Sequence, residues 1–361
     1  MTSNGTMAVP RVGIIGAGFM GEVHARAARA AGAEIVGIAS RTLASAQATA
    51  APLGVPAFAS LDDLLAAKPD VVHVCTPNDT HAAISAQVVA AGVAVVCEKP
   101  LAASSADARA LMDAAAEAGV VNTVPFVYRF HPMVREARAL VQQGAIGTVL
   151  SVQASYLQDW MLLQTDANWR MSDGSSRAFA DIGSHLCDLV EFVTGDRIVR
   201  LSARTRTVYA ERAGLPVSNE DIAAVMVEFA GGTIGTLLVS QMAAGRKNAL
   251  EFELHGAEQS VRFEQEKPEQ LHIGSRAGTM VRHRDASQLT PDAARLSVVP
   301  SGHPMGYQDA FNGFVRDTYS ALCGVAPESL PTFADGLRAA VMTEAVVASA
   351  GQAGAWVAVE S

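Results

Sequence analysis

Two side chains four residues apart, Asp181 and His185, have the types and the spacing for acid–base chemistry. The sequence predicts a helix from about Ala180 to Thr194, and residues at i and i+4 share one face of a helix. Histidine titrates near neutral pH and an adjacent carboxylate raises its basicity, so the pair can accept a proton from a hydroxyl. A structural histidine is one alternative. Asp188, three residues further along, leaves an Asp–His–Asp metal site as another.

A lysine directly follows a predicted buried strand, in the sequence Glu98-Lys99-Pro100. In open α/β sheets, ligands bind at the carboxyl ends of the strands. The ammonium group of Lys99 can therefore stabilise negative charge that develops on a reacting oxygen. A plain surface ion pair between Glu98 and Lys99 is the alternative. The segment Cys75-Thr76-Pro77-Asn78 ends a second predicted strand and is expected at the same edge.

Three glycines in the run Gly16-Ala-Gly18-Phe19-Met20-Gly21 follow the apolar segment Val12 to Ile15 and open a predicted helix. The GxGxxG dinucleotide fingerprint requires this context. Gly16 permits the tight turn, Gly18 lets a pyrophosphate approach the backbone, and Gly21 lets helix and strand pack closely. An ordinary turn is the alternative, but it gives no reason for three glycines that weaken helix and strand. We expect a bound dinucleotide that contacts Gly16, Gly18, Phe19, Met20 and Gly21.

The end of the second predicted strand bears on which dinucleotide is bound. NAD sites usually have an acidic residue about 20 positions after the glycine loop, where it accepts the ribose hydroxyls. Here Ile38-Ala39-Ser40-Arg41 has no acidic residue. Ser40 can hydrogen-bond a 2′-phosphate, and Arg41 can pair with it while stacking on adenine. We expect NAD(P) with NADP favoured; the alternative is that Arg41 only stacks and accepts both cofactors.

The elements that must position these residues form two domains. From Arg11 to about Phe126, short apolar runs alternate with helical stretches, which predicts an α/β Rossmann domain over residues 1–130 with a doubly wound parallel sheet. The expected helix caps are Ser60, Thr80 and Ser104. The expected strands are Val12–Ile15, Glu34–Ile38, Asp70–Val74, Val93–Val96 and Val120–Val124.

After His131-Pro132 the pattern changes to closely spaced β segments, with Gly231-Gly232 between two of them. This predicts an α+β domain over residues 131–361 with a largely antiparallel open sheet. Two closing helices, about Tyr307–Leu322 and Thr332–Ala350, are expected to cover it. The expected strands are Val149–Tyr156, Val199–Val208, Ala223–Phe229, Thr233–Ser240, Ala249–His255 and Ser260–Phe263.

Composition limits the classes of function. Of 361 residues, 50% are apolar and 17% are charged, and the net charge is 27 − 36 = −9 without a basic cluster, which argues against a nucleic-acid partner. No uninterrupted apolar run approaches the roughly 18 residues of a membrane span, so we expect a cytoplasmic protein without a membrane partner. The cysteines Cys75, Cys97, Cys187 and Cys323 lack CxxC spacing and are expected to be reduced thiols.

Four motifs together resemble the glucose–fructose oxidoreductase and inositol dehydrogenase family, written Gfo/Idh/MocA. They are the glycine run followed by His24, the segment from Thr76-Pro77-Asn78 to His81, Glu98-Lys99-Pro100, and Asp181 to His185. The resemblance spans nearly the whole chain. It implies an NAD(P)-dependent oxidoreductase that transfers a hydride between nicotinamide and a carbon bearing a hydroxyl, usually of a sugar, cyclic polyol or glycoside.

The resemblance also implies roles for individual residues. Lys99 would contact both the cofactor and the reacting oxygen, and Asp181 and His185 would be the proton-transfer pair, with no metal. We expect the remaining cofactor contacts from Thr76, Pro77, Asn78, His81 and Glu98. By analogy we expect a homodimer or homotetramer.

Substrate contacts are expected from the segment after the last Rossmann strand and from the loop before the catalytic helix. Aromatic faces suit sugar rings, and arginine or asparagine suits their hydroxyls. A loop anchored by Trp160 packing is the alternative for that residue. The expected contacts are Tyr128, Arg129, Trp160, Asn168, Trp169 and Arg170.

Two other classes of function stay open beside the dehydrogenase. A glycoside-cleaving enzyme could retain its nicotinamide, oxidise the sugar transiently and show no net redox change. A non-catalytic dinucleotide-binding regulator could use the same fold, but it would need neither Lys99 nor the Asp181 and His185 pair.

Overall fold

The computed structural model describes residues 9–172, 176–325 and 327–360, and its internal contacts divide the chain into two units. The N-terminal unit comprises the residues up to Pro125 together with Gln308–Leu337. The C-terminal unit comprises Phe126–Tyr307 and the residues from Arg338 onward. The boundary expected near residue 130 thus lies between residues 125 and 126. The segment Gln308–Leu337, which we expected in the second domain, belongs to the N-terminal unit.

The N-terminal unit contains a six-stranded sheet in which every pair of neighbouring strands is parallel. The strand order β3-β2-β1-β4-β5-β6 is that of a Rossmann sheet, which confirms the predicted fold. Only the two-residue β3 was not expected. The strands are β1 Arg11–Ile15, β2 Glu34–Ala39, β3 Ala57–Phe58, β4 Val71–Val74, β5 Ala94–Cys97 and β6 Asn122–Thr123.

Helices connect these strands, and two of the three expected caps are present. The hydroxyls of Ser60 and Ser104 each accept a hydrogen bond from the backbone three residues on, at 3.1 Å. Thr80 occupies the N-cap of α4, but its hydroxyl donates to the carbonyl of Pro77 over 2.7 Å, so the prediction of a side-chain cap there was wrong. The helices are α1 Phe19–Ala30, α2 Leu43–Ala50, α3 Leu61–Ala66, α4 His81–Ala90 and α5 Ser105–Ala118.

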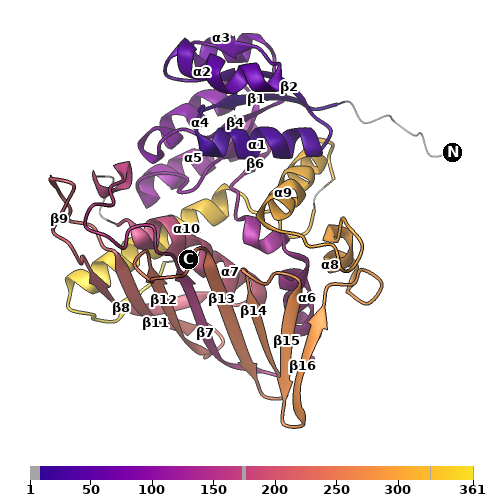
Figure 1. Cartoon of the computed structure of the whole chain (residues 1–361), viewed down its shortest axis with the longest axis vertical. Helices are drawn as coiled ribbons and strands as arrows, with labels where there is room; N and C mark the ends of the chain where they lie inside the picture. The colour runs from indigo at the N-terminus through magenta and orange to yellow at the C-terminus, as the bar shows by residue number, and fades with distance from the viewer. Residues whose placement is uncertain (1–8, 173–175, 326, 361) are drawn as a thin grey trace. The chain divides into compact units, whose positions relative to one another are not determined.

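Helix α9, Tyr307–Leu322, packs in the N-terminal unit rather than on the second sheet, which corrects our expectation. The amide of Gln308 donates to the carbonyl of Val23 on α1 over 3.4 Å, and the Phe311 ring lies 4.7 Å from the His24 ring. Figure 1 shows α9 beside α1. Its apolar face therefore covers the Rossmann sheet near α1, a pairing that chain order does not reveal.

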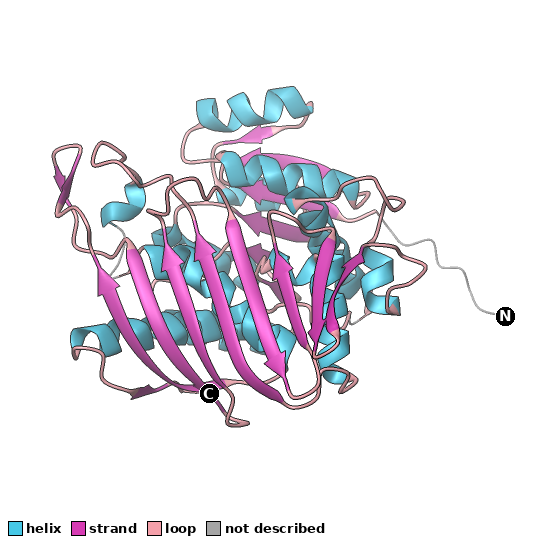
Figure 2. Cartoon of the chain, turned by 60° about the horizontal axis from the view of Figure 1, so that its bottom comes forward, coloured by secondary structure: helices cyan, strands magenta, loops and turns pink. Residues whose placement is uncertain are grey.

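The C-terminal unit is built on a nine-stranded sheet with the order β16-β15-β14-β13-β7-β12-β11-β8-β17 (Figure 2). Neighbouring strands are antiparallel except for β7 and β12, which are parallel, so the sheet is mixed but mostly antiparallel, as predicted. The strands are β7 Val149–Leu157, β8 Ile198–Arg206, β11 Ile222–Phe229, β12 Ile234–Ser240, β13 Ala249–Gly256, β14 Ser260–Glu264, β15 Gln270–Ser275, β16 Gly278–His283 and β17 Val357–Ala358. A separate short hairpin consists of β9 Glu211–Arg212 and β10 Leu215–Pro216.

One face of this sheet is buried and the other is exposed. In β11 and β12, buried and more exposed residues alternate, and helices cover the buried face (Figure 2). Among the described helices, none has the length and apolar character needed to span a bilayer. The remaining helices are α6 Pro132–Gln142, α7 Ser184–Thr194, α8 Pro291–Leu296 and α10 Phe333–Gly351, the last of which runs from one unit into the other.

Candidate active site

The glycine loop has the geometry that its sequence predicts. Gly16 has a φ of +113°, and a Cβ at this position would lie 2.3 Å from the carbonyl oxygen of Cys75. A Cβ on Gly21 would lie 2.2 Å from the carbonyl oxygen of Gly16. A Cβ on Gly18, in contrast, meets no atom of the described residues within 4 Å. The loop therefore presents open backbone at the start of α1, which suits an approaching pyrophosphate.

Ser40 and Arg41 lie directly after β2, before α2 begins. The Ser40 hydroxyl lies 3.3 Å from the Ser45 hydroxyl, and Thr42 caps α2 by accepting from the Ser45 backbone over 3.2 Å. Arg41 is exposed. This strand end therefore offers a hydroxyl and a solvent-accessible guanidinium to a group bound at the carboxyl edge of the sheet.

His81 joins the loops that follow β4 and β5. Its Nε2 lies 2.7 Å from the carbonyl oxygen of Thr76, and its Nδ1 lies 2.7 Å from the carbonyl oxygen of Pro100. Since carbonyls only accept, both ring nitrogens donate and the buried side chain is an imidazolium. Burial by itself lowers the pKa of His81, but Cys97 and the two carbonyls outweigh burial and raise the pKa to about 9. His81 thus holds together the two loops that carry Thr76 and Lys99.

Glu98 is buried, so the alternative of a surface ion pair with Lys99 was wrong. Its Oε1 lies 2.9 Å from Nε2 of His24, and its Oε2 accepts the backbone N–H of Lys99 over 3.1 Å. Burial by itself raises the pKa of this carboxyl, but the hydrogen bond and charge of His24, with the charge of Lys99, outweigh burial and lower the pKa. Glu98 is therefore an internal carboxylate that fixes the backbone of the lysine.

Asp181 lies in a π-helical turn, Phe179–Gly183, that leads into α7. Gly183 permits this turn, because a Cβ there would lie 2.5 Å from the Phe179 ring. The amide of Gln241 donates to Oδ2 of Asp181 over 3.0 Å, and Nε of Arg170 lies 3.6 Å from Oδ1. The predicted helix from Ala180 thus begins as a wider turn, in which an amide and a guanidinium fix the Asp181 carboxylate.

His185 follows in the first turn of α7 and is 9% exposed. Three aromatic rings surround it. The Phe126, Tyr128 and Tyr156 ring centroids lie 5.6, 5.1 and 6.5 Å from the imidazole centroid, the first two edge to face. These rings pack against the imidazole and limit the access of water to it.

A polar network beside His185 contains residues that the sequence prediction missed. Tyr128 and Tyr156 share a hydrogen bond between their hydroxyls, and the Tyr156 hydroxyl donates to Oδ1 of Asn248 over 2.6 Å. The Gln158 amide donates to the same oxygen over 3.0 Å and accepts from Nε1 of Trp160 over 2.7 Å. Burial raises the pKa of both tyrosines, so their hydroxyls stay protonated.

The sequence places each of the missed residues at an end of a predicted strand, but it does not show which strand ends meet. Tyr156 and Gln158 lie at the carboxyl end of β7, and Gln241 directly follows β12, which is parallel to β7. Asn248 directly precedes β13, whose first residue pairs with Leu157. All four therefore lie at one edge of the sheet.

Arg129 is buried in an ion pair. Its guanidinium donates through two nitrogens to Asp188, at 2.8 Å from Nε, and lies over the Phe192 ring. Asp188 is thus held by a cation, which disfavours the Asp–His–Asp metal interpretation. Arg129 connects the segment after the Rossmann strands to the helix that carries His185.

The loop before Asp181 is anchored at several points. Trp160 packs against a buried cluster of Met161, Met171 and Val217, in keeping with the alternative role that we considered for it. Oδ1 of Asn168 accepts from the backbone N–H of Arg170 over 3.1 Å. The side chain of Trp169 lies outside the described residues.

A buried ion cluster holds the base of this loop. Asp221 accepts from Arg177 and from Arg212, and all three side chains are fully buried. Arg212 also donates to the carbonyl of Leu163 over 2.7 Å, and Glu220 accepts from the backbone N–H of Phe179 over 2.8 Å. The cluster therefore joins the loop to the π-helical turn that carries Asp181.

The parallel sheet with a glycine loop at the start of α1 defines a dinucleotide-binding oxidoreductase unit. Residues 10–126 match a profile described as an oxidoreductase family with an NAD-binding Rossmann fold, and residues 134–262 match the GFO/IDH/MocA C-terminal domain. The chain belongs to the Gfo/Idh/MocA family of oxidoreductases.

Named relatives include sugar and polyol dehydrogenases. The chain is 30% identical over 385 residues to levoglucosan dehydrogenase of Pseudarthrobacter phenanthrenivorans, covering 94% of this chain and 95% of the relative. It is 30% identical over 270 residues to inositol 2-dehydrogenase of Rhizobium meliloti, covering 74% and 79%. A solved levoglucosan dehydrogenase in complex with NADH and levoglucosan has a TM-score of 0.91 at 28% identity, covering 98% of this chain and all of that one.

Proposed function

We propose that this enzyme transfers a hydride between NAD(P) and a secondary hydroxyl or ketone of a sugar or cyclic polyol. The observation that carries the proposal is the placement of Asp181 and His185 among hydroxyl and amide side chains. The same chain also has the glycine loop and Lys99. Relatives named for levoglucosan and inositol support the substrate class.

Each proposed catalytic residue has one chemical task. A bound nicotinamide ring supplies the hydride acceptor or donor. In the oxidation direction His185 takes the hydroxyl proton, and the Asp181 carboxylate stabilises the imidazolium that results. Lys99 stabilises negative charge on the substrate oxygen as that proton leaves. In reduction His185 returns the proton to the oxygen.

The proposed substrate contacts come from the polar network and the anchored loop. Asn248 and Gln158 offer two amides and Tyr156 offers a hydroxyl, and these groups discriminate a polyol from an apolar molecule because an unmatched polar group costs binding energy. Arg170 and Asn168 stay proposed contacts from the loop. For Arg129 we propose a positioning role: it holds α7 through Asp188 and does not contact substrate.

We further propose that NADP is preferred over NAD. The support is the strand end where Ser40 and the exposed Arg41 stand without an acidic residue. An acid at this position would repel a 2′-phosphate, whereas a guanidinium pairs with it. The solved levoglucosan dehydrogenase described above is a complex with NADH, so the proposed preference for NADP concerns this chain and not that relative.

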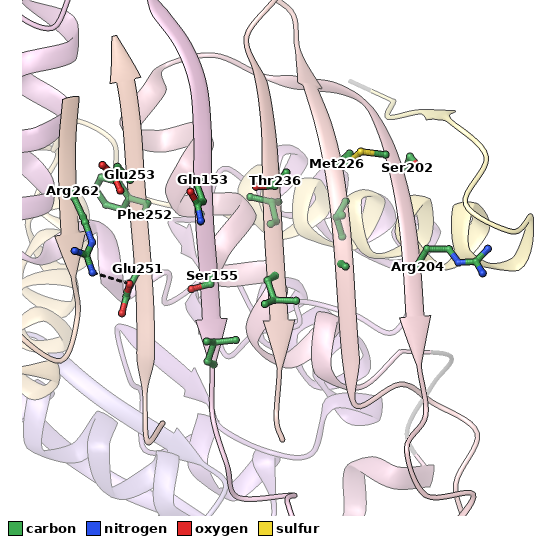
Figure 3. Close-up of a pocket in the computed structure, with 16 residues that line it drawn as sticks. Gln153, Ser155, Ser202, Arg204, Met226, Thr236, Glu251, Phe252, Glu253 and Arg262 are labelled. Carbon is green, nitrogen blue, oxygen red and sulfur yellow. Dashed lines mark hydrogen bonds and ion pairs between the residues drawn. The ribbon is translucent and has the colours of Figure 1, made fainter. Parts of the chain in front are cut away.

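We also propose that the exposed face of the nine-stranded sheet binds a second copy of the chain. A hollow of about 550 Å³ lies on this face (Figure 3). Met226 and Leu238 are 50% and 42% exposed there, and Arg262 pairs with Glu251 over 3.3 Å at the same hollow. Apolar side chains next to both signs of charge suit a self-complementary interface.

The oligomer is tested by size-exclusion chromatography with light scattering. Wild type should be a dimer or larger, and the double variant Met226→Asp, Leu238→Asp should dissociate. Val325→Asp is the control, since Val325 is also exposed but lies on the N-terminal unit. A monomeric wild type would contradict the proposal.

The function itself is tested with purified protein, both free cofactors and a panel of inositols, aldoses and glycosides. Stoichiometric appearance of reduced nicotinamide with at least one polyol supports a dehydrogenase. Cleavage of a glycoside without net reduction of cofactor would instead indicate the enzyme with retained nicotinamide. Tight cofactor binding with neither reaction would indicate a regulator.

A further inference from the structure

Four titratable side chains form one buried hydrogen-bonded chain in the N-terminal unit. Oε1 of Glu98 lies 2.9 Å from Nε2 of His24, and Nδ1 of His24 lies 2.8 Å from Nδ1 of His73. Nε2 of His73 lies 3.1 Å from the hydroxyl of Tyr319. The side chains come from four elements, which are the end of β5, α1, β4 and α9, and none is more than 7% exposed.

The contacts determine where protons reside in this chain. Glu98 is a carboxylate that only accepts, so Nε2 of His24 carries a proton. The two facing Nδ1 atoms of His24 and His73 share one proton between them. Burial and the charge of His24 hold the pKa of His73 well below its usual value, so His73 is neutral, with one donor and one acceptor nitrogen. The Tyr319 hydroxyl can either donate to or accept from Nε2 of His73. Each of the four side chains therefore has a hydrogen-bond partner.

This series of hydrogen bonds ends at the backbone of the proposed catalytic lysine. The second carboxylate oxygen of Glu98 accepts the Lys99 N–H over 3.1 Å. At the other side of Glu98, His24 belongs to α1, the helix that opens at the glycine loop. A single carboxylate thus connects the proposed pyrophosphate-binding helix with the backbone of Lys99.

We propose that His24 and His73 are positioning residues for Lys99: they hold the Glu98 carboxylate against the Lys99 N–H and so fix the lysine relative to α1. His24 supplies the donor, and His73, oriented by Tyr319, keeps the His24 ring in the orientation that directs Nε2 at Glu98. The inference rests on the proposed function, in which Lys99 contacts the reacting oxygen. Three other titratable groups interact electrostatically with Glu98. Against the effect of burial, the charges of Lys99 and His81 help to lower the pKa of Glu98, and burial together with the charge of Glu98 raises the pKa of Cys75.

The kinetic test compares substitutions that keep or remove the donor. In His24→Gln the amide nitrogen can still donate to Glu98, whereas His24→Leu removes the donor. We expect His24→Leu to lower kcat by about 10- to 100-fold, the usual range for a residue that orients a catalytic group, without weakening binding of reduced cofactor measured by its fluorescence. His24→Gln should recover most of kcat. Ser85→Ala, a buried change in the same unit, is the control.

A spectroscopic measurement reads the Lys99 hydrogen bond directly and needs no turnover. Labelling with [15N]lysine reports only Lys68, Lys99, Lys247 and Lys267, and Lys99→Arg identifies the Lys99 amide signal. We expect that signal to move upfield in His24→Leu and Glu98→Gln and to stay in place in His24→Gln and Ser85→Ala. If His24→Leu does not fold, Glu98→Gln and His73→Leu provide the same comparison.

Two results would overturn the inference. One is a Lys99 amide signal that stays in place in every folded variant lacking the His24 donor or the Glu98 charge. The other is an equal loss of kcat in His24→Gln and His24→Leu, since a loss independent of the donor would mean a packing role alone. Absence of turnover by wild type with every substrate would refute the proposed function instead, while the amide signal would still decide whether His24 holds Glu98 against Lys99.

Discussion

The side-chain amide of Gln241 donates to Oδ2 of Asp181 over 3.0 Å. An amide donor stabilises the ionised carboxylate and restricts its rotation, so one oxygen of Asp181 is committed to the protein. The carboxylate is thereby held in a single orientation on the turn that leads to His185. Asp181 is consequently suited to an electrostatic and orienting task rather than to proton transfer of its own.

Asp181→Asn should weaken the proposed base. The rate of oxidation should rise with pH as His185 loses its proton, because only the neutral imidazole accepts one. Removing the carboxylate charge destabilises the imidazolium, so the ascending limb of the pH profile should move to lower pH and its plateau should fall. The measurement is kcat/KM across pH for wild type and variant. An ascending limb that persists at near-normal rates in His185→Ala would show that another group is the base.

Lys99→Ala should abolish most turnover while leaving cofactor binding largely intact. Contacts that stabilise a developing oxyanion are worth roughly 3 to 4 kcal/mol, or about two to three orders of magnitude in kcat. Stopped-flow turnover and cofactor fluorescence separate the two effects. A variant that keeps most of the wild-type kcat would remove Lys99 from the mechanism.

Arg41→Ala should change the choice of cofactor. Loss of a guanidinium that pairs with the 2′-phosphate should lower kcat/KM for NADP by about tenfold or more, with little effect on NAD. Steady-state kinetics with both cofactors measure the ratio, and Arg26→Ala, an exposed arginine on α1, is the control. A wild-type preference for NAD that Arg41→Ala leaves unchanged would disprove the assignment.

Stability should fall at alkaline pH because of His81. Its folded-state pKa of about 9 lies above the value near 6.5 of an unfolded histidine, so its contribution is complete below pH 6.5 and is lost as pH rises through 9. The contribution is roughly 3 kcal/mol at most. Urea unfolding across this pH range should show the decline in wild type and in His255→Gln, and much less of it in His81→Gln. An equal decline in all three would exclude His81 as its source.

Local features were predictable from the sequence because neighbouring residues determine them. Gly16 has the positive φ that a tight turn before a helix demands. Ser60 and Ser104 each cap a helix by accepting from the backbone N–H three residues on, and the carboxylate of that residue accepts from the hydroxyl. Strand β16 escaped prediction because every residue of it is at least partly exposed, so its sequence lacks the apolar alternation of a half-buried strand. Strand β15 was missed although its buried residues Leu271 and Ile273 alternate with less buried ones.

Long-range pairings were not predictable in this way. His73 lies in an apolar run that indicates no polar partner, yet its partners His24 and Tyr319 lie 49 and 246 positions away in the sequence. Gln241 gave no motif of its own, and only the parallel pairing of β7 with β12 brings it to the edge where Asp181 lies. Such contacts depend on sheet order and helix placement, which single-sequence patterns do not contain.

The most direct measurement of the proposed hydride transfer is the absorbance of reduced nicotinamide when the purified enzyme is mixed with free NADP or NAD and each polyol of the panel, with Lys99→Ala and His185→Ala alongside. Wild type should produce reduced cofactor and ketone in equal amounts with at least one cyclic polyol or sugar, and both variants should be slower by about two orders of magnitude or more. A wild type that binds the cofactor but produces neither reduced nicotinamide nor ketone, or variants as fast as wild type, would contradict the assignment.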